Sequence, residues 1–170
     1  MVLENFGKLD EIIKKKIEFE ISQLDEHLSK SSVLVKKCAS QEPDYVELCA
    51  AGSILQSFYN GIENILLVIS KNIDGTILRQ GKWHSELLSS MFNPTENRPA
   101  VFSESLHSIL TDYMNFRHFF RHSYGYSMKW EKLSHLFINI NSNWERIEKE
   151  LIDFIAKMEG GNVQKVLPVQ

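Results

Sequence analysis

The sequence predicts an all-α protein, a four-helix up-and-down bundle with a long connection between the second and third helices. Apolar residues recur at steps of three and four along nearly the whole chain, the spacing of one face of an α-helix. Only 4 Pro and 8 Gly interrupt its 170 residues, and 43% of the residues are hydrophobic, enough for one core. The length is that of one domain. We therefore expect one bundle over residues 1–159 and a disordered tail over 160–170.

The first expected helix covers residues 6–40, where apolar side chains are spaced by three, four or seven. The second begins at Pro43, a residue favoured in the first turn of a helix. Asp44 and Glu47 follow it and complement the positive end of the helix dipole. The apolar spacing then continues until the Asp-Gly pair that ends at Gly75, where we expect the helix to stop.

Residues 75–102 form the long connection, because glycine and proline are concentrated there. A short helix is expected within it, from Trp83 to Phe92. A connection of this length in a compact domain is uncommon and is often functional.

The third expected helix starts at Ser103, a good N-cap residue, and ends around 122–125. The fourth carries the most regular pattern in the chain, from Trp130 to Met158, with apolar steps that alternate three and four without exception. That alternation is typical of the seam of a left-handed helix bundle.

Composition and charge exclude several classes of protein. The net charge is −3, which excludes a broadly basic nucleic-acid binder. The longest aliphatic run, 65–69, is far shorter than a membrane-spanning helix, and the N-terminus has no apolar secretion block. Cys38 and Cys49 fit no metal or disulfide spacing. We therefore expect a cytoplasmic protein with reduced thiols and no membrane partner.

The positive charge of the chain is concentrated in residues 113–135, which hold four Lys and Arg side chains against one acid. The same segment holds three of the six histidines. A local basic patch on an acidic protein suggests a confined anion site.

Arg117 falls at the edge of the apolar stripe of the third helix, where a guanidinium needs a partner. It could serve an anion site, or it could be structural, paired with Glu63 or Glu104. His122 lies about 140° further round the same helix. The two side chains converge if the helix ends or kinks between them, or if a second subunit supplies its copy across a two-fold interface. His122 could instead cap the helix end.

An arginine and a histidine near one phosphate suggest a reaction. Histidine can take the proton of a ribose 2′-hydroxyl, while arginine stabilises the charge that develops on the phosphate. This is RNA cleavage without a metal. His118 and His122 also stand at the i, i+4 spacing of metal ligands, but the sequence offers no third ligand beside them, so we expect no metal and no other cofactor.

Three segments, in order, resemble the HepT-like proteins of the HEPN superfamily. The segment FRHFFRHSYGYSMKWEKL (116–133) resembles the family motif R-x4-H-x-Y, which stands here as Arg117, His122 and Tyr124. SFYNGIENILLVIS (57–70) and NSNWERIEKELIDFI (141–155) resemble the matching parts of its second and fourth helices. Together the resemblance covers roughly residues 43–158.

The resemblance implies a HEPN-like bundle that forms a homodimer in which two motifs line one cleft. Family members are typically metal-independent ribonucleases, and many are toxins of toxin–antitoxin pairs. Carried over by position, Arg117 would hold phosphate and His122 would be the general acid and base. Glu63 would position the motif, and His118 and Arg121 would support it. The family more often has a small polar residue at the position of His118.

The partner that the resemblance implies is a minimal nucleotidyltransferase, the cognate antitoxin, which can silence the toxin by attaching AMP to the motif tyrosine, here Tyr124. Transfer RNA is the substrate we expect, because one small basic patch suits a local structured element. The alternative is a non-catalytic HEPN module that docks a nucleotidyltransferase or a nucleotide through the same cleft. The neighbouring gene and the effect of overexpression on growth would separate the two.

Overall fold

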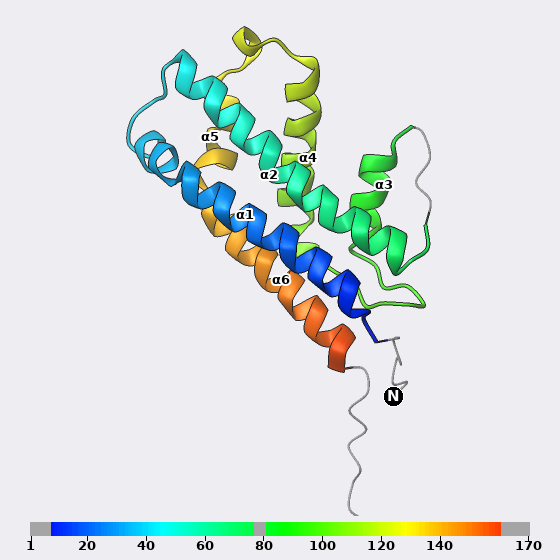
Figure 1. Ribbon diagram of the computed structural model, residues 1–170. Helices are drawn as coiled ribbons and strands as arrows, with labels where there is room; N and C mark the ends of the chain where they lie inside the picture. The colour runs from blue at the N-terminus through cyan, green and yellow to red at the C-terminus, as the bar shows by residue number, and fades with distance from the viewer. Residues whose placement is uncertain (1–7, 77–80, 161–170) are drawn as a thin grey trace, which may run out of the picture.

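The computed structural model describes residues 8–76 and 81–160, and these form an all-helical bundle (Figure 1). The prediction of an all-α protein is confirmed for this part of the chain, which contains no strand. The predicted tail lies outside it, apart from Gly160. The α-helices are α1 (Glu11–Cys38), α2 (Tyr45–Asn72), α3 (Trp83–Ser90), α4 (His107–His122), α5 (Trp130–Ile138) and α6 (Ile140–Gly160).

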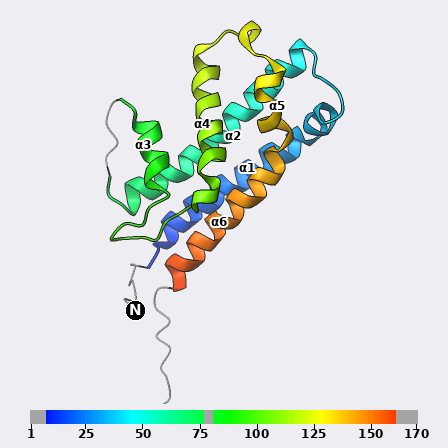
Figure 2. The same cartoon turned by 180° about the vertical axis from the view of Figure 1, so that it is seen from behind.

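The four longest helices, α1, α2, α4 and α6, alternate in direction along the bundle (Figures 1 and 2). At one end, Lys37 of α1 forms an ion pair with Glu47 of α2. At the other end, Lys14 Nζ of α1 lies 2.6 Å from Glu159 Oε1 of α6. The up-and-down arrangement therefore brings the start of α1 beside the end of α6. None of the described helices is long and apolar enough to cross a membrane.

The starts of α1 and α2 are set by side-chain caps. Asp10 accepts hydrogen bonds from the backbone of the first turn of α1, so this helix begins at Glu11 and is shorter than expected. In α2, Asp44 and Glu47 form a capping box in which each side chain accepts from the backbone N–H of the other. Pro43 consequently precedes the N-cap and lies outside the first turn, contrary to the prediction.

Two predicted helices are modified by polar side chains. Ser103 does not cap α4, because its hydroxyl donates to Glu150 Oε1 at 2.6 Å; residues 104–106 form a 3₁₀ turn and α4 starts at His107. The predicted fourth helix is interrupted at Asn139, whose side-chain amide donates to the carbonyl of His135 at 2.8 Å. Asparagine competes with the backbone for such bonds. The apolar seam nevertheless continues across the break and stays buried.

The long connection folds against the end of α2. Arg98 is fully buried, and its Nε lies 2.9 Å from Asp74 Oδ1 just beyond α2. Its other nitrogens donate to the backbone carbonyls of Ser90, Asn93 and Pro99. This one side chain therefore ties the end of α2 to α3 and to the segment after it. The expected helix within the connection is present, as α3.

Candidate functional site

Arg117 and His122 stand on one uninterrupted helix. Since α4 runs from His107 to His122, no helix end falls between them, and five residues place them about 140° apart round the axis. A helix end between the two residues, one route to convergence that the sequence left open, is therefore not present in α4.

Arg117 faces α2, and only 12% of its side chain is exposed. Its Nε donates a hydrogen bond to the side-chain oxygen of Asn60. Its Nη2 lies 3.2 Å from Oε1 of Glu63, one turn further along α2. Nη1 makes no hydrogen bond to any residue that the structure describes. The guanidinium is therefore held on two sides, with one nitrogen left for a ligand.

Glu63 is almost fully buried and links Arg117 to the connection. Its second oxygen, Oε2, lies 2.6 Å from Nδ1 of His84, which is on α3. Because a carboxylate accepts, Nδ1 of His84 is the donor in this hydrogen bond. The result is a continuous chain of polar contacts, Asn60–Arg117–Glu63–His84, that joins α2, α3 and α4.

Sequence reasoning missed two members of this chain, Asn60 and His84. Asn60 stands three residues before Glu63 on α2, so the spacing of the two could have placed them on one helix face. His84 had no such signal, because it comes from the connection and its position depends on how that segment folds.

Tyr59 is buried on the same side of α2. Burial raises the pKa of its hydroxyl well above the ordinary value, the Glu63 carboxylate adds to this effect, and Arg117 opposes it. The hydroxyl has no hydrogen-bond partner among the described residues. Tyr59 therefore packs as an uncharged side chain beside the Arg117–Glu63 ion pair.

The end of α4 presents a different set of side chains to solvent. His118 and His122 are both exposed, and their ring centroids are 4.7 Å apart. Arg121 lies in the same exposed last turn. Tyr124 follows the end of the helix and is 74% exposed. No group of three His, Cys, Asp or Glu side chains in the described ranges lies close enough to hold a metal ion.

The sequence-predicted residues thus form two groups. Glu63 and Arg117 lie together between α2 and α4, while His118, Arg121, His122 and Tyr124 gather at the exposed end of α4. Within the protomer the arginine of the motif faces α2, whereas the histidine is exposed to solvent. The protomer does supply a guanidinium with one open nitrogen and an accessible imidazole, and such groups can stabilise charge on a phosphate and transfer a proton.

Comparison with known proteins identifies one family. The sequence profile of the family described as HepT-like protein matches residues 50–158, more than half of the chain, from the first half of α2 to the end of α6. No curated protein and no solved structure shows a significant match.

Proposed function

Because the chain belongs to the HepT-like family of the HEPN superfamily, we propose that it is a metal-independent endoribonuclease, the toxin of a toxin–antitoxin pair. Transfer RNA is the proposed substrate. One observation carries the proposal: within the matched region, the exposed end of α4 offers the His122 imidazole, and the same helix holds Arg117.

In the proposed reaction, His122 removes the proton of a ribose 2′-hydroxyl and the 2′-oxygen attacks the adjacent phosphorus. The bond from phosphorus to the 5′-oxygen of the next nucleotide breaks, and that oxygen takes the proton back from the His122 imidazolium as it leaves. The products are a 2′,3′-cyclic phosphate and a 5′-hydroxyl. Arg117 holds a non-bridging phosphate oxygen through Nη1 and stabilises the charge that develops on it.

A homodimer completes the site in this proposal. Arg117 and His122 leave one helix about 140° apart, so within one protomer the two side chains do not face the same way. A two-fold interface near the end of α4 would bring the Arg117 of one protomer towards the His122 of its partner.

A minimal nucleotidyltransferase is the proposed antitoxin. Tyr124 is well exposed just beyond the end of α4 and close in sequence to His122. AMP on its hydroxyl would place a bulky anion at the mouth of the site, where it would obstruct and repel an RNA phosphate. The wild-type protein purified with its partner would then carry the mass of one AMP on this residue.

The ion pair between Arg117 and Glu63 supports a second candidate function, a non-catalytic binding module. The ion pair with Glu63 largely neutralises Arg117 within the protomer, which is the arrangement of a structural arginine. This favours the non-catalytic alternative, in which the chain docks a nucleotidyltransferase or a nucleotide without cleaving RNA.

The deciding experiment incubates the purified protein with total transfer RNA in EDTA, beside His122→Ala, and analyses fragments and their ends. Discrete fragments with cyclic phosphate ends from the wild type alone support the ribonuclease. Cleavage by both proteins indicates a contaminant or another catalyst. No cleavage by either folded protein, with no AMP on Tyr124 by mass spectrometry, favours the binding module.

A further inference from the structure

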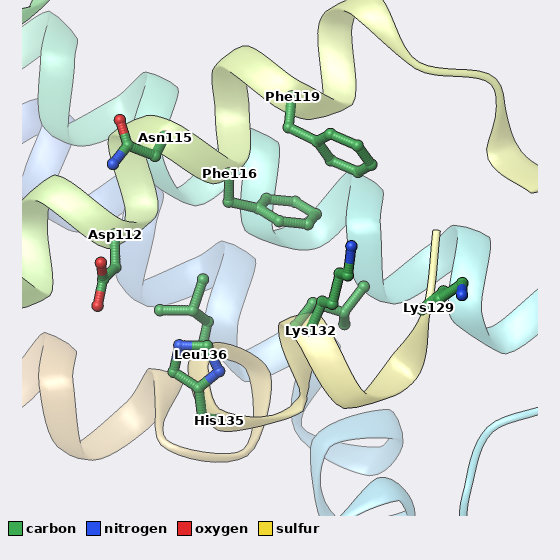
Figure 3. A pocket seen from close by; sticks show the side chains of 9 residues that line it. Asp112, Asn115, Phe116, Phe119, Lys129, Lys132, His135 and Leu136 are labelled. Carbon is green, nitrogen blue, oxygen red and sulfur yellow. The ribbon is translucent and has the colours of Figure 1, made fainter. Parts of the chain in front are cut away.

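A pocket of about 270 Å³ lies between α4 and α5 (Figure 3), on a different side of α4 from Arg117. This volume is slightly below the range of about 300–1,000 Å³ that is usual for small-molecule sites, so it suits one small planar ligand. Two aromatic rings, two lysines, a carboxylate and a carboxamide contribute to its lining: Phe116, Phe119, Lys129, Lys132, Asp112 and Asn115.

The aromatic, cationic and hydrogen-bonding side chains of the pocket occupy different parts of it. The ring of Phe119 is 40% exposed, and the more deeply buried Phe116 lies beside it. Figure 3 shows Asp112 and Asn115 at one end and Lys129 at the other, with the Lys132 side chain rising from α5 towards the Phe119 ring. Neither lysine forms an ion pair with a residue that the structure describes. The pocket therefore offers an aromatic face between a cationic end and a hydrogen-bonding end.

We propose that this pocket binds one nucleotide of single-stranded RNA. The base stacks on Phe119, as bases do on aromatic platforms that bind single strands. The phosphate lies against Lys129 and Lys132, and the edge of the base faces Asp112 and Asn115. The assignment of that RNA as a substrate rests on the proposed function, whereas the binding itself does not.

The position of the pocket along α4 connects it to the exposed histidines. Asn115, Phe119 and His122 stand at i, i+4 and i+7, the spacing of neighbours on one helix face. An RNA strand with one base in the pocket can therefore continue along this face towards His122. The pocket would set which nucleotide lies next to the reacting phosphate.

The Asp112 carboxylate at the hydrogen-bonding end of the pocket predicts a base preference. Adenine, cytosine and guanine carry an exocyclic amino group that can donate to Asp112, whereas uracil carries none. We therefore expect an adenine oligonucleotide to bind more tightly than a uracil oligonucleotide. Asp112→Leu would reduce the difference to the part that stacking on Phe119 contributes.

The test uses fluorescein-labelled hexamers of 2′-O-methyl RNA, which cannot be cleaved because they lack the attacking hydroxyl. Fluorescence anisotropy is measured with the full-length protein in EDTA. Phe119→Leu keeps an apolar side chain but removes the ring, so we expect binding at least about fivefold weaker. Lys132→Gln removes one phosphate contact and lowers the slope of log affinity against log salt by about 0.7.

Matched controls come from a second phenylalanine- and lysine-bearing surface, on α1. Phe19 is 59% exposed there, and Lys15 lies one turn before it. Phe19→Leu and Lys15→Gln should leave binding unchanged. Circular dichroism of each variant confirms that it is folded, and sedimentation records its oligomeric state.

Each outcome has a defined meaning. Loss of binding in the pocket variants alone supports the inference, even if the wild type cleaves no RNA, in which case only the proposed function fails. Equal binding by the wild type and the pocket variants overturns the inference, even if the wild type is a ribonuclease. No binding by the wild type also overturns it. A change of oligomeric state in Phe119→Leu with unchanged RNA binding assigns the pocket to a subunit interface instead.

Discussion

The Nη2 nitrogen of Arg117 lies 3.2 Å from Oε1 of Glu63, in an ion pair that joins α4 to α2 within the bundle. Both side chains are largely buried, and each has a further polar partner, Asn60 for Arg117 and His84 for Glu63. The geometry fixes the direction of the Arg117 guanidinium before any ligand arrives. A pre-oriented charge of this kind loses little freedom when it meets a phosphate.

Arg117→Ala should abolish cleavage and lower the free energy of unfolding by about 3 kcal/mol, because it leaves the buried Glu63 carboxylate without its cationic partner. The bundle itself should survive. Chemical denaturation measures the loss. Arg121→Ala is the matched control, since Arg121 lies on the same helix but is exposed, and its unfolding free energy should change by less than about 0.5 kcal/mol. Equal losses in the two variants would contradict the role of the ion pair.

His122→Ala should abolish cleavage while the free energy of unfolding stays within about 0.5 kcal/mol of the wild type, because the ring is exposed. Thermal denaturation and cleavage of transfer RNA in EDTA check the two halves of this prediction. A variant that cleaves normally would remove His122 from the proposed mechanism. A variant that loses stability would instead assign the histidine a structural role at the end of α4.

Mixing Arg117→Ala with His122→Ala should restore activity if the site is shared between subunits. In the mixed dimer, one of the two clefts receives an intact arginine from one protomer and an intact histidine from its partner. Random exchange would then recover about one quarter of wild-type cleavage. If each site were built within one protomer, the mixture would stay inactive. Sedimentation that shows only monomers at micromolar concentration would count against a shared site.

Tyr113→Phe should destabilise the bundle by about 1–3 kcal/mol. The Tyr113 hydroxyl donates to the carbonyl of Leu136 at 2.9 Å and accepts from Asn143 at 2.9 Å, and removing it breaks both of these hydrogen bonds. Tyr59→Phe is the matched control, because the Tyr59 hydroxyl has no partner among the described residues, and it should cost less than about 0.5 kcal/mol. Urea denaturation of both variants measures the contrast. Equal costs would refute this account of the two hydroxyls.

Alkaline pH should destabilise the protein through the same tyrosine. Burial raises the pKa of Tyr113 from 10.0 to about 12, while the hydrogen bond from Asn143 opposes the shift. A raised pKa means that the stabilising contribution is complete below pH 10.0 and is lost as the pH rises to about 12. Unfolding free energies measured across this interval should fall, and Tyr113→Phe should show a shallower decline. An identical decline in both proteins would assign it to other groups.

The helical class, the order of the long helices and the family were all available from the sequence. Periodic apolar residues bury themselves whatever the details of packing, and for this reason α2 and α6 follow the predicted stripes. Local polar chemistry was harder to anticipate. Asn139 interrupts the helix that carries the most regular apolar spacing in the chain. The apolar spacing does not show that the Asn139 side chain, rather than a backbone N–H, donates a hydrogen bond to the His135 carbonyl.

The spacing of apolar residues along the chain was thus enough to predict which helix faces are buried, and the three matching segments were enough to indicate the family. The partners of Arg117 came from the packing of the helices: it pairs with Glu63 rather than Glu104, and His84 from the connection contacts the same carboxylate. The physical reason is that periodicity is a local property of one helix. A buried ion pair depends instead on how separate helices cross, and that crossing is set by the packing of the whole core.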